Sequence, residues 1–243
     1  MRKERWTTRT TYKVPGYVQC NLVVLPKNDA LDFLIFCNRN RAACPVLDIT
    51  EVGNAEPMVA ALGADLRTDL ARYAVYLRGK LAETPTNIID QWRDDAVGFL
   101  IGSSLTFDTA LARAGVTLSP DVWVYRSNIP TVPAGRFHGS LIVTLRFFSP
   151  RDAIIATQLT SRFPNNHGAP RHIGDPSALG IELSKPIFGE PLEKIPEGKV
   201  ALYWDCGVTP QQVALDSGIE WMITHHPGHA FITDLKADEI CIP

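Results

Sequence analysis

The amino-acid sequence predicts an α/β protein with a mixed or largely parallel sheet and flanking helices, arranged as two interlocked α/β lobes. Strand-like and helical patterns alternate along the chain. The run Ala96–Gly102 is continuously apolar, as a strand buried on both faces requires. Near the C-terminus, the strand Val200–Gly207, a helix starting at Thr209-Pro210 and the strand Trp221–Thr224 form a unit that is typical of a right-handed crossover between parallel strands.

Composition excludes several classes of protein. Of the 243 residues, 45% are hydrophobic and 21% charged, which is ordinary for a globular protein. A net charge of -2 without a basic face argues against nucleic acid as a partner. No apolar run approaches the roughly 20 residues that cross a bilayer, so we expect a cytoplasmic protein without a membrane partner. Five cysteines without C-x-x-C spacing are expected to be free thiols.

The first half of the chain predicts scaffold elements. A variable lead, residues 1–14, precedes an N-terminal lobe expected over residues 15–123. In this lobe Pro15–Pro26 ends as a strand, and Asn28 or Asp29 can cap the helix that follows. Further strands are expected at Cys44–Thr50, Arg72–Leu77 and Ala96–Gly102. Ser103 and Ser104 then precede an amphipathic helix that ends at Gly115, and the free N–H groups at such a start can hold a carboxylate.

The second half, residues 124–243, is expected to form a C-terminal lobe that carries most of the site. Its first segment, Val124–Gly139, is rich in proline and glycine and leads into the strand Ser140–Phe148. Ser149 and Pro150 occupy the favoured first positions of a helix. That helix enters Thr160–Gly180, a loop whose glycines and prolines hold polar side chains in set directions.

All six histidines follow Phe137 and fall in loops shaped by glycine and proline. His225 and His229 have the spacing of a helical ligand pair, but Pro227 and Gly228 between them favour a loop. No cofactor is required by the sequence, and a divalent metal remains an alternative. Cys206 follows a strand and precedes a helix, a setting that can lower the pKa of a thiol, although a buried small residue fits equally well.

If the C-terminal unit is a parallel crossover, both of its strands end on one edge of the sheet. Cys206, His225 and His229 would then share that edge, with the loop from His167 to Asp175 closing over it. The catalytic candidates are therefore His167, His172, Asp175, Cys206, His225 and His229. The candidates for binding a substrate carboxylate are Arg136, His138, Arg171, Asn128, Ser103 and Ser104, with Arg136 expected to lack a local charge partner.

Seven ordered motifs resemble those of the bacterial putative hydro-lyase family related to D-glutamate cyclase. They are PGYVQCNLVVLP, CPVLDITEVG, DLRTDLARYAVY, YRSNIPTVPAGRFHGSLIV, TSRFPNNHGAPRHIGDPSALGI, YWDCGVTPQ and ITHHPGHAFITDL. The resemblance extends from Pro15 to Leu235. Two departures are the lead before Pro15, which is unlike the family's usual approach, and a shorter segment from Thr117 to Trp123.

The resemblance implies a hydro-lyase that dehydrates a small amino acid, such as D-glutamate, to 5-oxoproline. It assigns no catalytic residues, so the candidates above rest on the residues themselves. The expected partner is a small carboxylate or amino acid, and a homo-oligomer is left open. The alternatives are a metal-dependent hydrolase of a cyclic amide and a carboxylate-binding module without catalysis.

Overall fold

The computed structural model of the chain, described for residues 6–10 and 13–242, contains two β-sheets. One sheet has the strand order β2-β5-β1-β10-β3-β4, with β11 also paired to β1, and the other has the order β6-β7-β9-β8. The first comprises β1 (Tyr17–Pro26), β2 (Val46–Ile49), β3 (Tyr73–Leu77), β4 (Lys80–Glu83), β5 (Ala96–Gly102), β10 (Trp221–His225) and β11 (Phe231–Lys236). The second comprises β6 (Trp123–Pro130), β7 (Ser140–Phe148), β8 (His172–Ile173) and β9 (Val200–Asp205). We call them the seven-stranded and the four-stranded sheet.

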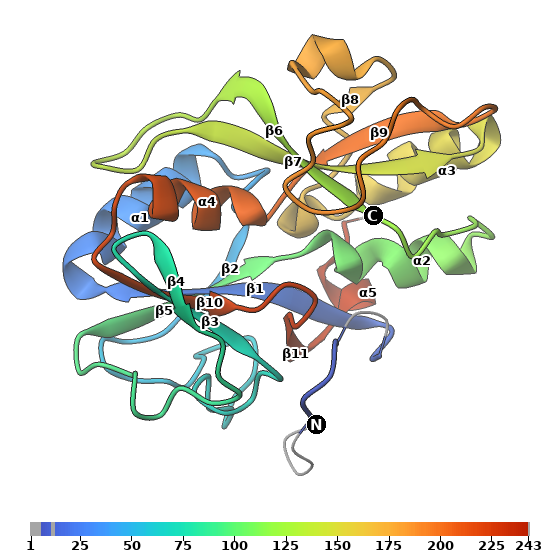
Figure 1. Cartoon of the computed structure of the whole chain (residues 1–243). Coiled ribbons are helices and arrows are strands. Elements are labelled where there is room, and N and C mark those ends of the chain that lie inside the picture. The colour runs from blue at the N-terminus through green and yellow to red at the C-terminus, as the bar shows by residue number, and fades with distance from the viewer. Residues whose placement is uncertain (1–5, 11–12, 243) are drawn as a thin grey trace.

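Two helices lie between the sheets. α1 (Lys27–Arg39) and α4 (Val208–Asp216) separate the four-stranded sheet from the seven-stranded sheet below it (Figure 1). Phe33 and Phe36 of α1 are fully buried and pack edge-on or tilted against Phe137, which precedes β7. The same cluster contains Val213 of α4 and Val23 of β1. Apolar side chains from both sheets therefore meet on these two helices.

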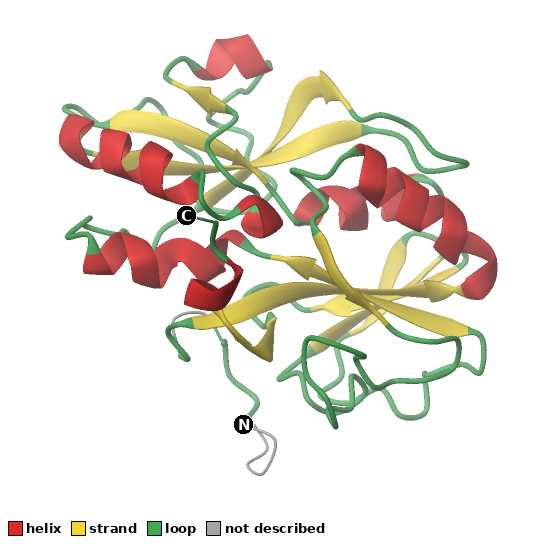
Figure 2. Cartoon of the chain, turned by 180° about the vertical axis from the view of Figure 1, so that it is seen from behind, coloured by secondary structure: helices red, strands yellow, loops and turns green. Residues whose placement is uncertain are grey.

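Most of the remaining helices cover the other end of the molecule (Figure 2), whereas Leu179 of a short helix packs with Tyr125 and Val143 of the four-stranded sheet in a separate cluster. Phe107 packs against Trp204 of β9 and against Phe163, in a core cluster that also includes Ala156. Ser149 caps its helix as expected, because its Oγ accepts a hydrogen bond from the N–H of Asp152 at 3.1 Å. The helical elements other than α1 and α4 are η1 (Ser104–Phe107), α2 (Asp108–Arg113), α3 (Pro150–Thr160), η2 (Pro164–Asn166), η3 (Pro176–Leu179) and α5 (Ala237–Ile240).

The prediction of a largely parallel sheet is wrong, although the α/β class is confirmed. Every pair of named strands in the described residues is antiparallel. β9 pairs with β7 and β8, whereas β10 pairs with β1 and β3, so α4 connects strands of different sheets. The crossover rule holds only for two strands of one sheet. The expected shared edge for Cys206 and His225 therefore does not exist.

Local expectations were corrected in smaller ways. α1 begins at Lys27 after Pro26, and no side chain caps it, so Asn28 and Asp29 lie inside the helix. The segment expected as a shaped loop before β7 contains β6, an edge strand in which Pro130 occupies the last position. The helix expected before Gly115 is divided into η1 and α2. Of the expected N-terminal lead, residues 1–5 and 11–12 lie outside the described residues.

No helix in the described part of the chain has the length and apolar character needed to cross a membrane.

Candidate functional site

A polar region lies where β1 faces the space between the sheets. Side chains alternate along a strand, so Gln19 and Asn21 share a face with Val23, which packs in the inter-sheet core. Gln19 and Asn21 are nevertheless buried, with 3% and 8% of their surfaces exposed. The amide of Asn21 lies against Gly207, where any larger residue would collide with it. We call this region, with the residues that meet it from β5, η2 and β9, the junction.

The end of β5 brings backbone and hydroxyl groups to the junction. Gly102 lies so close to the carbonyl of Asn165 that a Cβ atom would overlap it, which explains the glycine. The N–H of Ser103 donates to the carbonyl of Gln19 at 3.0 Å. Its Oγ accepts from the N–H of Leu105 at 3.4 Å, so this serine caps η1. Ser104 is the first residue of η1 and is partly buried.

His167 enters the junction from the end of η2 in an unusual backbone conformation. Its φ of 80° lies in the left-handed region, which a residue other than glycine occupies at a cost. The side chain is buried, and its Nδ1 lies 2.8 Å from the carbonyl oxygen of Ala42. Because a carbonyl only accepts, Nδ1 carries the proton and Nε2 carries the lone pair. Burial lowers the pKa of His167, while the nearby Asp205 carboxylate acts in the opposite direction.

Arg171 and Asp205 form an ion pair beside this histidine. The Nε and Nη2 atoms of Arg171 each bond to one carboxylate oxygen of Asp205, a two-point geometry. The Asp205 side chain is 3% exposed, whereas that of Arg171 is 35% exposed. Asp205 therefore fixes a guanidinium group whose Nη1 edge is not used by the carboxylate. Arg171 was predicted from the sequence as a site residue, and Asp205 was not.

Cys206 lies at the junction, where its surroundings oppose the first of the two alternatives that the sequence left open, an acidic thiol or a buried small residue. Burial raises the pKa of Cys206, and Asp205 raises it further, against hydrogen bonds from Thr144 and from the Val208 N–H that lower it. The same burial raises the pKa of the neighbouring Cys44. A thiolate at Cys206 is consequently disfavoured at neutral pH, although by surface exposure the residue is only partly buried.

Two other predicted site residues of this loop, His172 and Asp175, form hydrogen bonds within the loop that stabilise its conformation. The Nε2 atom of His172 lies 2.8 Å from the carbonyl oxygen of Asp175. The Asp175 carboxylate accepts from the N–H of Ser177 at 2.9 Å and from its hydroxyl at 2.6 Å, and these bonds lower the pKa of Asp175. Asp175 thus caps η3 at the exposed tip of the segment.

Arg136, His138 and Asn128 are exposed, unlike the buried Gln19, Asn21 and His167 of the junction. The Nη1 atom of Arg136 is 3.3 Å from a carboxylate oxygen of Asp29 in the first turn of α1. The expectation that Arg136 lacks a local charge partner is therefore wrong. Asn128 lies instead against Gly180, the residue that directly follows η3. The structure shows that the turn before β7 packs on α1, a contact that the sequence did not indicate.

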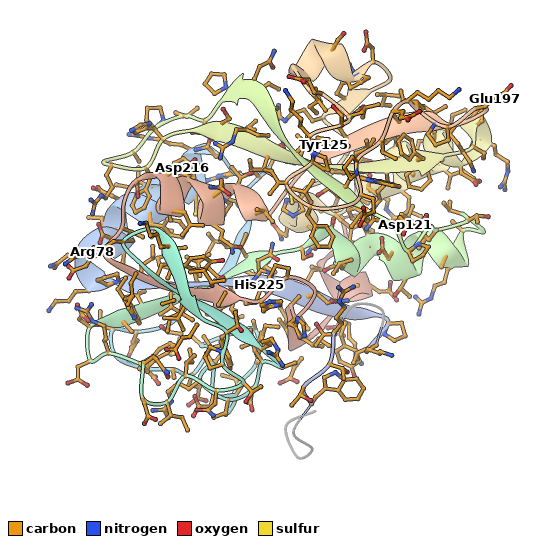
Figure 3. The ribbon with its side chains drawn as sticks, viewed as in Figure 1. Arg78, Asp121, Tyr125, Glu197, Asp216 and His225 are labelled. Carbon is orange, nitrogen blue, oxygen red and sulfur yellow. The ribbon has the colours of Figure 1, made fainter. Side chains whose placement is uncertain are left out.

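His225 is the last residue of β10 in the seven-stranded sheet, where Figure 3 shows it across from Tyr125 of the other sheet, and His226 and His229 follow in the turn before β11. β1 pairs with β10 at Val23 and with β11 at Cys20, and between these positions the N–H of Leu22 donates to Nδ1 of His225 at 3.3 Å. The rings of His226 and His229 pack edge to face, with centroids 5.1 Å apart. His225 therefore fills a gap in the strand ladder beside Leu22, and its Nδ1 atom is already used as the acceptor of this hydrogen bond.

The buried His225 predicts a loss of stability in mild acid. Burial lowers its pKa to about 4, against 6.5 for an unperturbed histidine. Between these pH values the unfolded chain binds a proton that the folded chain does not. The free energy of unfolding should therefore fall as pH drops from about 6.5 to about 4, by roughly 3 kcal/mol, and then level off. Urea unfolding at several pH values measures this component.

The matched variant is His225→Asn, because the Asn Oδ1 atom can replace Nδ1 as acceptor for the Leu22 N–H. This protein should lack the histidine component of the pH dependence, whereas His138→Asn, at an exposed position, should keep it. The same pH dependence in His225→Asn and the original protein would contradict the prediction.

Among residues 6–10 and 13–242, no group of three or more His, Cys, Asp or Glu side chains is arranged to hold a metal ion. A groove of about 520 Å³ lies beside α1 and β2 and contains none of the predicted site residues. Its lining is largely apolar, from residues that include Leu31, Leu34, Ile49, Val52 and Phe99.

The residues that the sequence-based prediction missed include Gln19, Asn21 and Asn166. The sequence contains a signal for Gln19 and Asn21. In YVQCNLVV, two amides stand two residues apart within an apolar strand, which places both on one face. A buried face carrying two amides is unusual, because buried polar groups need partners. Asn166 offered no comparable pattern, since its burial follows from the packing of η2 on Gly102.

Comparison with known proteins places this chain in a family. The profile of the family described as D-glutamate cyclase matches residues 97–234. A Geobacillus kaustophilus protein named "putative hydro-lyase" is 50% identical over 246 aligned residues, which cover 99% of this chain and 93% of that protein. A Bacillus subtilis protein of the same description is 48% identical, with 93% and 90% covered.

Among solved structures, a nitrogen repressor-like protein from Methanococcus jannaschii has 13% identity and a TM-score of 0.42, over 88% of this chain and 85% of its own. That likeness is too weak to bear on function. The sequence relationships are close and extend over nearly the whole chain. The protein belongs to the D-glutamate cyclase family, together with bacterial relatives named as putative hydro-lyases.

Proposed function

We propose that this protein is a hydro-lyase that closes D-glutamate, or a similar small amino acid, to 5-oxoproline at the junction. Family membership supports the reaction class. The observation that carries the choice of site is His167, a buried histidine with a strained backbone, a proton fixed on Nδ1 and an Nε2 lone pair. Nε2 has no hydrogen-bond partner among the described residues. Such a group is suited to accept a proton.

The reaction needs no external reductant or nucleotide. The amine nitrogen forms a bond to the side-chain carboxyl carbon, and one carbon–oxygen bond of that carboxyl group breaks. The ammonium group loses two protons in becoming the ring N–H, and the departing oxygen gains two in becoming water. One residue that accepts a proton from nitrogen and donates it to oxygen can therefore serve both steps.

His167 and Arg171 fit these needs. Neutral His167 would take the proton from the ammonium at Nε2 and return it to the departing oxygen. The free Nη1 edge of Arg171 would hold a substrate carboxylate and reduce its negative charge, which makes its carbon a better electrophile. Asp205 would act as a positioning residue, because it fixes the guanidinium without touching the substrate.

Five thiols with no disulfide among them favour a reducing compartment, and we place the enzyme in the cytoplasm on that basis.

The test is turnover by the purified protein. D-glutamate, L-glutamate and both enantiomers of 5-oxoproline are incubated separately, with and without a chelator, and followed by chiral chromatography. Formation of 5-oxoproline from one glutamate enantiomer supports the proposal. Ligand binding without conversion in either direction would overturn it in favour of a binding module, and chelator-sensitive hydrolysis of 5-oxoproline would favour a metal-dependent hydrolase.

A further inference from the structure

Within the described residues, three buried side-chain atoms have no hydrogen-bond partner, and two of them are amide oxygens at the junction. They are Oε1 of Gln19 and Oδ1 of Asn166, and the third is the hydroxyl of Tyr203. Gln19 is 3% exposed and Asn166 is fully buried. Buried polar atoms are nearly always paired, so each such atom calls for a specific explanation.

The Asn166 side chain and the backbone of Gln19 are joined in one small network. The Oγ1 atom of Thr106 accepts from the backbone N–H of Gln19 at 3.0 Å and from Nδ2 of Asn166 at 3.0 Å. Nδ2 of Asn166 also donates to the carbonyl of Ser103 at 3.2 Å. Because that carbonyl only accepts, the Asn166 amide cannot be turned around, and its Oδ1 must be the atom without a partner. His167, the proposed base, is the next residue.

Both unpaired atoms are neutral acceptors, so a donor is the matching ligand group. In the substrate class proposed above, the only group with several N–H donors is the ammonium. We infer that Gln19 Oε1 and Asn166 Oδ1 accept hydrogen bonds from the substrate ammonium and hold its nitrogen near His167. The inference rests on the proposed function, and it adds the residues that distinguish an amino acid from a plain dicarboxylate.

Neutral amides suit this task better than carboxylates. A carboxylate beside the ammonium would favour its charged form and raise its pKa, which would keep the nitrogen from becoming a nucleophile. An amide oxygen orients the nitrogen with a much smaller electrostatic preference for the proton. The two amides thus position the amine while leaving deprotonation to His167.

The test compares D-glutamate with glutarate, which has both carboxyl groups and no amine. Gln19→Met is the main variant, since it keeps the side-chain length and removes the oxygen. We expect D-glutamate to bind about 10- to 100-fold more weakly to Gln19→Met, as loss of a charge-assisted hydrogen bond implies, and glutarate to bind equally to both proteins. Calorimetric titration measures both affinities.

A second readout uses the unliganded protein. If Oε1 has no partner before the ligand binds, Gln19→Met should unfold at the same or a higher temperature than the original protein. A lower unfolding temperature, with unchanged D-glutamate affinity, would show that a buried water satisfies Oε1 and would overturn the inference. Equal weakening of both ligands would also overturn it, because it would indicate a structural role.

The outcomes for the inference and for the proposed function are separable. Selective loss of D-glutamate binding in Gln19→Met, with no turnover by the original protein, would support the ammonium site and contradict the proposed reaction. Turnover by the original protein, with D-glutamate affinity unchanged in Gln19→Met, would support the proposed reaction and contradict the ammonium site. Failure of the original protein to bind D-glutamate would contradict both.

Discussion

Replacing His167 by asparagine should lower the turnover number for D-glutamate by about 10²- to 10⁴-fold, the usual contribution of a general acid–base group. Asparagine tolerates the left-handed backbone that His167 adopts, and its amide N–H can still donate to Ala42. The substitution therefore removes the Nε2 atom while keeping the local structure. Steady-state kinetics, with circular dichroism to check folding, measure the effect.

The matched control is His138→Asn, because His138 is an exposed histidine whereas His167 is buried. This variant should retain the original turnover number. The original enzyme should also lose activity only as pH falls through a value below 6.5, because burial lowers the pKa of His167 and catalysis needs the neutral ring. A folded His167→Asn protein with undiminished turnover would rule out the assigned base.

The substitution Asp108→Ala should lower the free energy of unfolding by about 3–5 kcal/mol, as breaking a buried ion pair does. The Nη1 and Nη2 atoms of Arg146 lie 2.5 and 3.2 Å from the two carboxylate oxygens of Asp108. Both side chains are almost fully buried, and the Arg146 guanidinium also lies over the ring of Phe107. The variant would leave a buried guanidinium without this carboxylate, and urea unfolding measures the cost.

A surface ion pair between the same two residue types provides the comparison. Arg113 and Asp238 are 2.8 Å apart, with both side chains largely exposed. Asp238→Ala should change the free energy of unfolding by less than about 1 kcal/mol, because water and ions screen exposed pairs. If both variants lost equal stability, burial would not be the cause of the Asp108 effect.

Expectations that depend on neighbouring residues were largely correct. The apolar run Ala96–Gly102 forms β5, buried along its length, and Ser149 and Pro150 start α3. His167, with Arg171 four residues on, lies in a segment shaped by glycine and proline, as expected. Capping, burial pattern and turn chemistry are local properties, so a single sequence is enough to indicate them.

The histidine candidates show where such reasoning fails. Cys206 and His225 were expected on one edge, with the loop of His167 closing over it, because a strand, a helix and a strand follow one another in the chain. In the structure, β9 joins β7 in one sheet and β10 joins β1 in the other. Nothing in the intervening segment specifies this choice, because strand partners are selected by side-chain packing between segments far apart in sequence.

By itself, the sequence determined the α/β class, the family and the loop that carries His167 and Arg171. Only the tertiary structure decided that Gln19, Asn166 and Asp205 join them, while Arg136 pairs with Asp29 instead. The physical reason is that burial, ion pairing and the pKa of a side chain depend on groups brought together by folding. Residue type and spacing indicate what a side chain can do, and its neighbours in space decide whether it does so.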